Sequence, residues 1–120
     1  MLNGFEEQTK PLDEYEEKTL LPLVILGLSN KVGKGKAVKN NYICKMLKTQ
    51  GYKIDGARLR KLINHIRIRN MVIGLIATSD GYYIAESRSE MGKYLQSLRG
   101  RENAIKAVRV AIENQMEVMY

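Results

Sequence analysis

Apolar residues recur at helical spacing in three stretches of the chain before residue 71, and each stretch predicts a helix. The first should run from about Glu14 to Leu28. Its run LLPLVILGL is apolar nearly all round, which indicates a buried helix. Asp13 is expected to cap it, and Pro22 is expected to kink or split it, because proline removes an N–H that a helix interior uses.

A second helix is expected over YICKMLKTQ, with Asn40 or Asn41 as its cap and Gly51 as its stop. Its apolar side would carry Tyr42, Ile43, Met46 and Leu47. Cys44 is expected to be a small packing residue. Between the first two helices, SNKVGKGKAVKN should form a flexible basic loop. It resembles a phosphate-binding loop, but its spacing is wrong and Gly35 follows Gly33–Lys34 where that motif needs Ser or Thr.

The third helix should begin after Asp55, its expected cap. On a helical wheel its apolar residues fall within about one third of the circle. These residues are Leu59, Leu62, Ile63 and Ile66. The opposite side carries Ala57, Arg60, Lys61 and Asn64, with Arg58 and His65 near its margins. The helix therefore has an apolar inner side and a basic, hydrogen-bonding outer side, and His65 is expected to bond locally.

After Asn70 the spacing changes to that of strands, and MVIGLIAT, the turn at Ser79–Gly81 and YYIA predict a β-hairpin. Tyr82 and Tyr83 should alternate faces, one packing on the third helix and the other meeting backbone or solvent. SRSE at Ser87–Glu90 then fits a capping box that opens a long final helix.

That final pattern, from Ser89 to Met119, would be ~45 Å long if unbroken. Its apolar stripe is interrupted by Glu102 and Arg109. Either the helix breaks at Gly100 and folds back over the first helix, or the stripe joins two copies of the chain. The second alternative is favoured. The expected dimerisation residues are Met91, Leu95, Leu98, Ile105, Val108, Ile112, Met116 and Met119.

Charge divides the chain into three parts. Residues 1–30 hold two Lys/Arg and six Asp/Glu, a net charge of −4. Residues 31–70 hold twelve Lys/Arg and one Asp/Glu, a net charge of +11. Residues 71–120 hold six of each kind and are neutral, so the three parts add up to the net charge of +7. A positive middle third favours a polyanionic partner, although it could also be a solvated basic face.

Several classes of protein are not supported by the composition. One cysteine allows neither an internal disulfide nor a cysteine-based zinc cluster, and no cofactor or metal site is expected. A single histidine and scattered acids argue against an enzyme. No signal peptide is visible, and the longest apolar run is too short to span a bilayer, so a cytoplasmic protein without membrane contact is expected.

The stretches NNYICKMLKTQGYKIDGARLRKLINHIRIRNMV and GLIATSDGYYIA resemble the winged helix-turn-helix DNA-binding family, and in particular small regulators of phages and mobile elements. The resemblance covers about 13–86. It implies a mainly α fold with a small β-hairpin, a winged helix-turn-helix followed by a long C-terminal helix. Residues 1–12 would then be a flexible N-terminal segment, and 87–120 a helical arm for dimerisation.

The resemblance also implies that the third helix enters the major groove of double-stranded DNA. Carried onto this chain, the base-reading residues are Ala57, Arg58, Arg60, Lys61 and Asn64. The residues expected to hold phosphates are Lys31, Lys34, Lys36, Lys39, Arg67 and Arg69. The hairpin tip, Ser79–Asp80, departs from the family because it lacks a basic residue.

The sequence thus predicts a homodimeric, sequence-specific DNA-binding protein that acts as a transcriptional regulator or as a replication or recombination accessory. The alternative is a winged-helix interaction module that docks an acidic protein. RNA binding is less favoured because no aromatic sheet surface for stacking bases is predicted.

Overall fold

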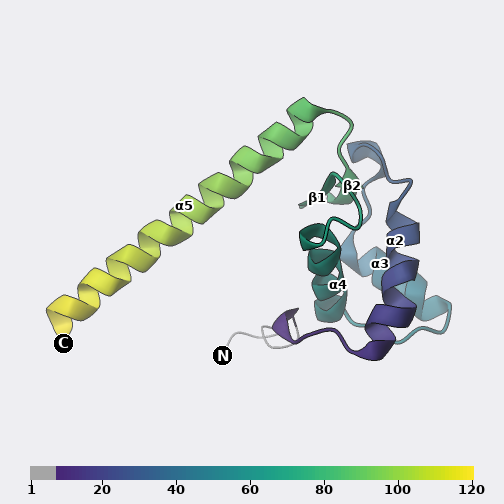
Figure 1. The fold of residues 1–120 in the computed structure, drawn as a ribbon, viewed down its shortest axis with the longest axis horizontal. Coiled ribbons are helices and arrows are strands. Elements are labelled where there is room, and N and C mark those ends of the chain that lie inside the picture. The colour runs from purple at the N-terminus through teal and green to yellow at the C-terminus, as the bar shows by residue number, and fades with distance from the viewer. Residues whose placement is uncertain (1–7) are drawn as a thin grey trace. The chain divides into compact units, whose positions relative to one another are not determined.

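The computed structural model of the chain describes residues 8–120. As predicted, it is mainly helical, with one antiparallel β-hairpin and a long C-terminal helix (Figure 1). It divides into two compact units, Met1–Glu86 and Ser87–Tyr120. The first unit holds helices α2, α3 and α4 and the hairpin, and the second holds α5.

The first helix begins at a reciprocal cap. The backbone N–H of Glu16 donates to Asp13 Oδ1 (2.8 Å), and the N–H of Asp13 donates to Glu16 Oε1 (3.0 Å). The helix is a π-helix, η1, over Glu16–Leu20 and continues as α2 over Leu21–Leu28. Pro22 lies in the first turn of α2, where its missing N–H costs least. The predicted split at Pro22 is therefore a change of helix type.

Residues 1–7 of the segment expected to be flexible lie outside the described residues. The last three residues of that segment contact the first unit. Arg58 donates to the carbonyl oxygens of Lys10 (2.9 Å) and Pro11 (3.0 Å), and Leu12 packs against the core. Residues 10–12 are therefore anchored to the first unit.

Helix α3 spans Asn40–Thr49, and α4 spans Gly56–Ile68. Gly51, at a φ of 89°, follows the end of α3, and Asp55 caps α4 by accepting from the Arg58 N–H (2.8 Å), both as predicted. Asn70, at a φ of 57°, lies in the left-handed region just beyond α4.

Asn40 is not the cap of α3, because the helix begins at Asn40 itself and Lys39 precedes it. The Asn40 amide instead joins three elements. Its Nδ2 donates to the Gly56 carbonyl oxygen (3.0 Å), and its Oδ1 accepts from the Tyr82 hydroxyl (2.7 Å). One polar side chain thus ties α3 to α4 and to the hairpin.

The hairpin pairs β1, Leu75–Thr78, with β2, Gly81–Ile84, and turns at Ser79 and Asp80. The loop before α3 is not a free flexible loop, because its backbone pairs with β2. The N–H of Val38 donates to the Tyr82 carbonyl (3.0 Å), and that of Tyr82 donates back (2.8 Å). The Ile84 N–H donates to the Lys31 carbonyl (2.7 Å). A 3-10 turn, η2 over Lys34–Lys36, lies between these contacts.

The core of the first unit lies between η1–α2, α3, α4 and the hairpin. The predicted inner side of α4 is confirmed, because its four apolar residues are almost completely buried: Leu59, Leu62, Ile63 and Ile66. Cys44 is buried as predicted. Tyr82 and Tyr83 are both buried, so neither faces solvent.

Helix α5 runs from Arg88 to Met119 without a break, capped by Ser87, whose Oγ accepts from the Glu90 N–H (3.1 Å). It contains 32 residues, which corresponds to ~48 Å. Gly100 does not end it, so the alternative of a break and a fold-back at that residue is wrong. None of its residues is buried.

Candidate functional site

The outer side of α4 is partly open within the first unit. Arg60 and Asn64 are exposed, and Ala57 and Lys61 are half-buried. These four residues are spaced at 0, 3, 4 and 7 positions, so they form one row along the helix. The buried residues on the opposite side hold the helix in this rotation, and the row is therefore presented outward by the packing of the core.

Beside this row a shallow depression of about 560 Å³ lies between α3 and the first turns of α4. Arg60 borders it on α4, and Lys45 and Lys48 border it on α3. The other lining residues are Asn40, Asn41, Cys44, Thr49 and Gly56. Three cationic side chains therefore surround one hollow whose remaining polar groups are amides and a hydroxyl.

Sequence reasoning missed the contribution of α3. Asn41, Lys45 and Lys48 are spaced at 0, 4 and 7 positions and are all exposed, so this polar row was visible in the sequence. The sequence did not show that this row of α3 lies next to Arg60. Burial raises the pKa of the Cys44 thiol at the edge of this hollow above its ordinary value.

Arg58 does not belong to the open row, which corrects the prediction that it reads bases. Its side chain is directed into the first unit, and the residue as a whole is only 9% exposed. Nε donates to Glu16 Oε2 (2.7 Å), and Nη2 donates to Glu16 Oε1 (2.6 Å). This fork-to-fork pair lowers the pKa of the Glu16 carboxyl, mainly through the hydrogen bonds from Arg58. Arg58 thus joins α4 to the first helix.

The residues expected to hold phosphates are not all equivalent. Lys34, Lys36, Lys39 and Arg69 are exposed, whereas Lys31 and Arg67 are half-buried. Lys34 Nζ lies 3.4 Å from Asp80 Oδ2 across the hairpin turn. This pair partly neutralises the turn, which has no basic residue of its own. His65 is half-buried at the margin of the row.

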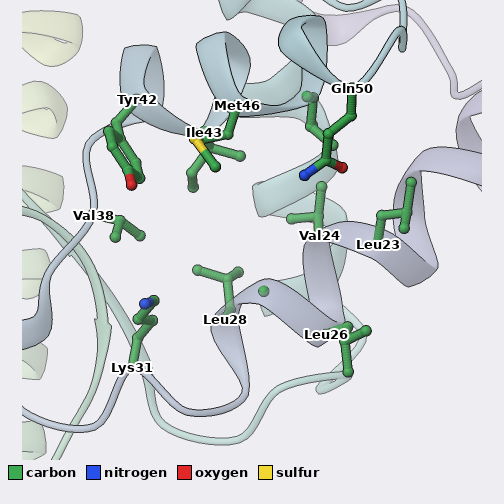
Figure 2. Close-up of a pocket in the computed structure, with 12 residues that line it drawn as sticks. Leu23, Val24, Leu26, Leu28, Lys31, Val38, Tyr42, Ile43, Met46 and Gln50 are labelled. Atoms are coloured by element: carbon green, nitrogen blue, oxygen red, sulfur yellow. The ribbon is translucent and has the colours of Figure 1, made fainter.

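Lys31 lines a second, apolar groove between α2 and α3 (Figure 2). The groove has a volume of about 350 Å³. Its most exposed apolar side chains are Leu26 (73%), Tyr42 (55%) and Met46 (42%). The predicted apolar side of α3 is therefore only partly covered, since Leu47 is buried and Tyr42 and Met46 are not.

In the second unit, all eight predicted dimerisation residues are exposed, from 37% for Leu98 to 70% for Ile105. The described residues contain no cluster of His, Cys, Asp and Glu suited to a metal ion. Within the same part of the chain, none of the helices has the length and apolar character needed to cross a membrane. Comparison with protein-family models, curated proteins and solved structures found no match.

Proposed function

We propose that the chain is a winged helix-turn-helix protein that binds double-stranded DNA through the outer row of α4. The observation that carries this proposal is the exposed pair Arg60 and Asn64, with Lys45 and Lys48 across the adjoining depression. Arginine can donate two parallel hydrogen bonds to guanine, and asparagine can pair with adenine. A row of this composition on an exposed helix matches the chemistry of base edges in a major groove.

The surrounding cations supply the second element of the proposal. Lys36 and Lys39 precede α3 and Arg69 follows α4, so exposed positive charge lies at the ends of both helices. Such residues hold phosphates and orient a protein on the duplex without selecting a sequence. The half-buried Lys31 contributes least to this group, because it borders the apolar groove.

The test begins with selection of duplexes from a random library by the full-length chain, followed by fluorescence anisotropy on the selected site. We expect Arg60→Ala and Asn64→Ala each to cost about 1–3 kcal/mol on that site and to relax the choice of base. Lys45→Ala and Lys48→Ala should weaken all duplexes alike. If about five phosphates are neutralised per copy, log affinity should fall with log salt at a slope of roughly −4 to −5.

Lys18→Ala is the matched control. Lys18 is an exposed lysine of the first helix, paired with Glu14 (2.7 Å) and remote in sequence from the basic third of the chain. The Lys18→Ala substitution removes one positive charge, as Arg60→Ala does, but leaves the outer row of α4 unchanged. Unchanged affinity for the selected site in Arg60→Ala would contradict the proposal, as would an equal loss of affinity in Lys18→Ala.

We further propose that the exposed apolar stripe of α5 joins two copies of the chain. A dimer would offer two rows to two half-sites about 34 Å apart, or a multiple of that distance. Sedimentation velocity on the full-length chain, with and without Ile105→Lys and Ile112→Lys, tests this directly. A monomer in the wild-type protein at tens of micromolar would contradict it.

The second candidate is docking of an acidic protein on the same basic surface. The Lys34–Asp80 pair favours it, because a partly neutralised hairpin tip is a poor probe for a minor groove. Failure to select any duplex, together with retention of the chain on an acidic protein surface that Arg60→Ala abolishes, would favour this candidate over DNA.

A further inference from the structure

The stripe of α5 has the seven-residue repeat of a coiled-coil seam. Five exposed apolar residues lie seven apart along it: Met91, Leu98, Ile105, Ile112 and Met119. When these five are assigned to position d of the heptad, position a is filled by Arg88 in the first turn of α5 and then by Leu95, Glu102, Arg109 and Met116. From Met91 to Met119 the seam is therefore apolar near both ends and charged at two places in the middle. The positions of those two charges favour one of the two ways in which two copies of α5 can pair, parallel or antiparallel.

We infer that two copies of α5 pair in antiparallel orientation. The inference deepens the dimer proposed above and rests on it, but it is independent of DNA binding. In a parallel pair every seam residue faces its own copy. Glu102 would face Glu102 and Arg109 would face Arg109, each at a partly dehydrated position. The flanking positions would add contacts between Arg101 and Lys106. Each of these contacts joins like charges, which is destabilising.

In an antiparallel pair, position a of one helix faces position d of the other. Alignment of Leu95 with Met119 also places Leu98 against Met116, so both ends of the seam become apolar layers. Glu102 then lies beside Ile112, and Arg109 beside Ile105, where their aliphatic stems can cover the isoleucines and their charged groups can reach solvent. Glu102 no longer meets its own copy, and neither does Arg109.

The residues that flank the seam also fit this alignment. Arg99 of each helix faces Glu113 of the other, which gives two contacts between opposite charges. Val108 faces its own copy at the centre, and this explains an apolar residue on the flank of the stripe. One repulsive contact remains, between the two Lys106 side chains. Glu113 is positioned for its role by Arg109, whose Nη1 donates to Glu113 Oε1 (2.5 Å) within the helix.

Disulfide cross-linking of the full-length chain distinguishes the two orientations. A disulfide requires Cβ atoms about 3.5–4.5 Å apart. We expect Val108→Cys to cross-link with itself and Leu95→Cys not to do so, while a mixture of Leu95→Cys with a size-tagged Met119→Cys should give the mixed product. The wild-type chain, whose Cys44 is buried, is the control. Self-linking of Leu95→Cys without that of Val108→Cys would overturn the antiparallel orientation and leave the dimer intact. A monomer in sedimentation would overturn both.

A charge swap provides an independent measurement. Glu113→Arg should weaken the dimer roughly tenfold, because two attractive contacts become repulsive, and Arg99→Glu combined with Glu113→Arg should restore its affinity. Glu117→Arg is the matched control, since Glu117 lies at position b, away from the seam. Equal weakening by both single variants, or no rescue in the double variant, would overturn the proposed alignment.

Discussion

Arg58 and Arg60 are two positions apart on α4 and should behave in opposite ways when replaced by alanine. The Arg58 side chain donates two hydrogen bonds to the Glu16 carboxylate and one each to the Lys10 and Pro11 carbonyl oxygens. Alanine at position 58 removes all of them and leaves a carboxylate buried without its counter-charge. Arg60 is exposed at the edge of the depression between α3 and α4, and its replacement buries no unpaired group.

Loss of one partner from a buried ion pair typically costs about 3–5 kcal/mol. The Arg58 and Glu16 side chains are 11% and 6% exposed, so solvent screens the pair only weakly and the buried-pair range applies. For a unit of this size, each 1 kcal/mol lowers Tm by about 4–8 °C. We therefore expect Arg58→Ala to lower Tm by at least roughly 12 °C. Arg60→Ala should change stability by no more than about 0.5 kcal/mol.

The assay is urea and thermal unfolding followed by near-UV circular dichroism. The buried Tyr82 and Tyr83 report on the first unit in this signal, whereas the far-UV signal includes the 32 residues of α5. Glu16→Gln combined with Arg58→Ala should be less destabilised than Arg58→Ala alone, since no buried charge is then left unpaired. Equal stability of Arg58→Ala and Arg60→Ala would refute the assignment of Arg58 to the core.

Three further outcomes are expected. Gly81→Ala should destabilise the first unit by about 1–3 kcal/mol in the same unfolding assay, because Gly81 has a φ of 117° and a Cβ there would lie 2.5 Å from the Val38 carbonyl oxygen. Ser79→Ala, in the exposed turn, is the control. A Gly81→Ala variant as stable as the wild type would contradict the close approach to Val38. The pKa of Glu16 is lowered on folding, mainly by hydrogen bonds from Arg58. The ionised Glu16 therefore stabilises the fold above the ordinary pKa of 4.5, and this contribution is lost as pH falls through the pKa of the folded state. The free energy of unfolding measured between pH 6 and 2.5 should show this loss, and Glu16→Gln should show less of it. Tyr82→Phe should lower the free energy of unfolding by about 0.5–1.5 kcal/mol, because the hydrogen bond from the Tyr82 hydroxyl to Asn40 is lost. Burial raises the pKa of Tyr82, so the variant should lack the tyrosine that titrates at the highest pH in an ultraviolet titration. An unchanged titration would contradict the burial of the hydroxyl.

Much of the fold could be predicted from the sequence because the relevant signals are local. The apolar repeat of α4, the caps at Asp13, Asp55 and Ser87, and the turn before Gly81 each depend on residues within a few positions of one another. The unbroken course of α5 follows from the same local preference, since the one glycine expected to interrupt it is flanked by helix-forming residues.

The candidate site was only partly predictable. Arg60, Lys61 and Asn64 follow from the helical period, which places them opposite the core. Arg58 lies at the margin of that wheel, where a rotation of a few tens of degrees decides between solvent and interior. Glu16, its partner, is 42 positions away, so no local pattern connects the two.

Side-chain periodicity along one helix is determined by the sequence alone, because backbone hydrogen bonds fix the angle between successive residues. Which of two neighbouring arginines meets a buried carboxylate depends on how one helix packs against another, and only the tertiary structure decided that. The same holds for Asn40, which leaves its expected role as a cap to join α3, α4 and β2, and for Lys45 and Lys48. These roles arise from contacts between elements, and the free energy of those contacts exists only once the core has formed.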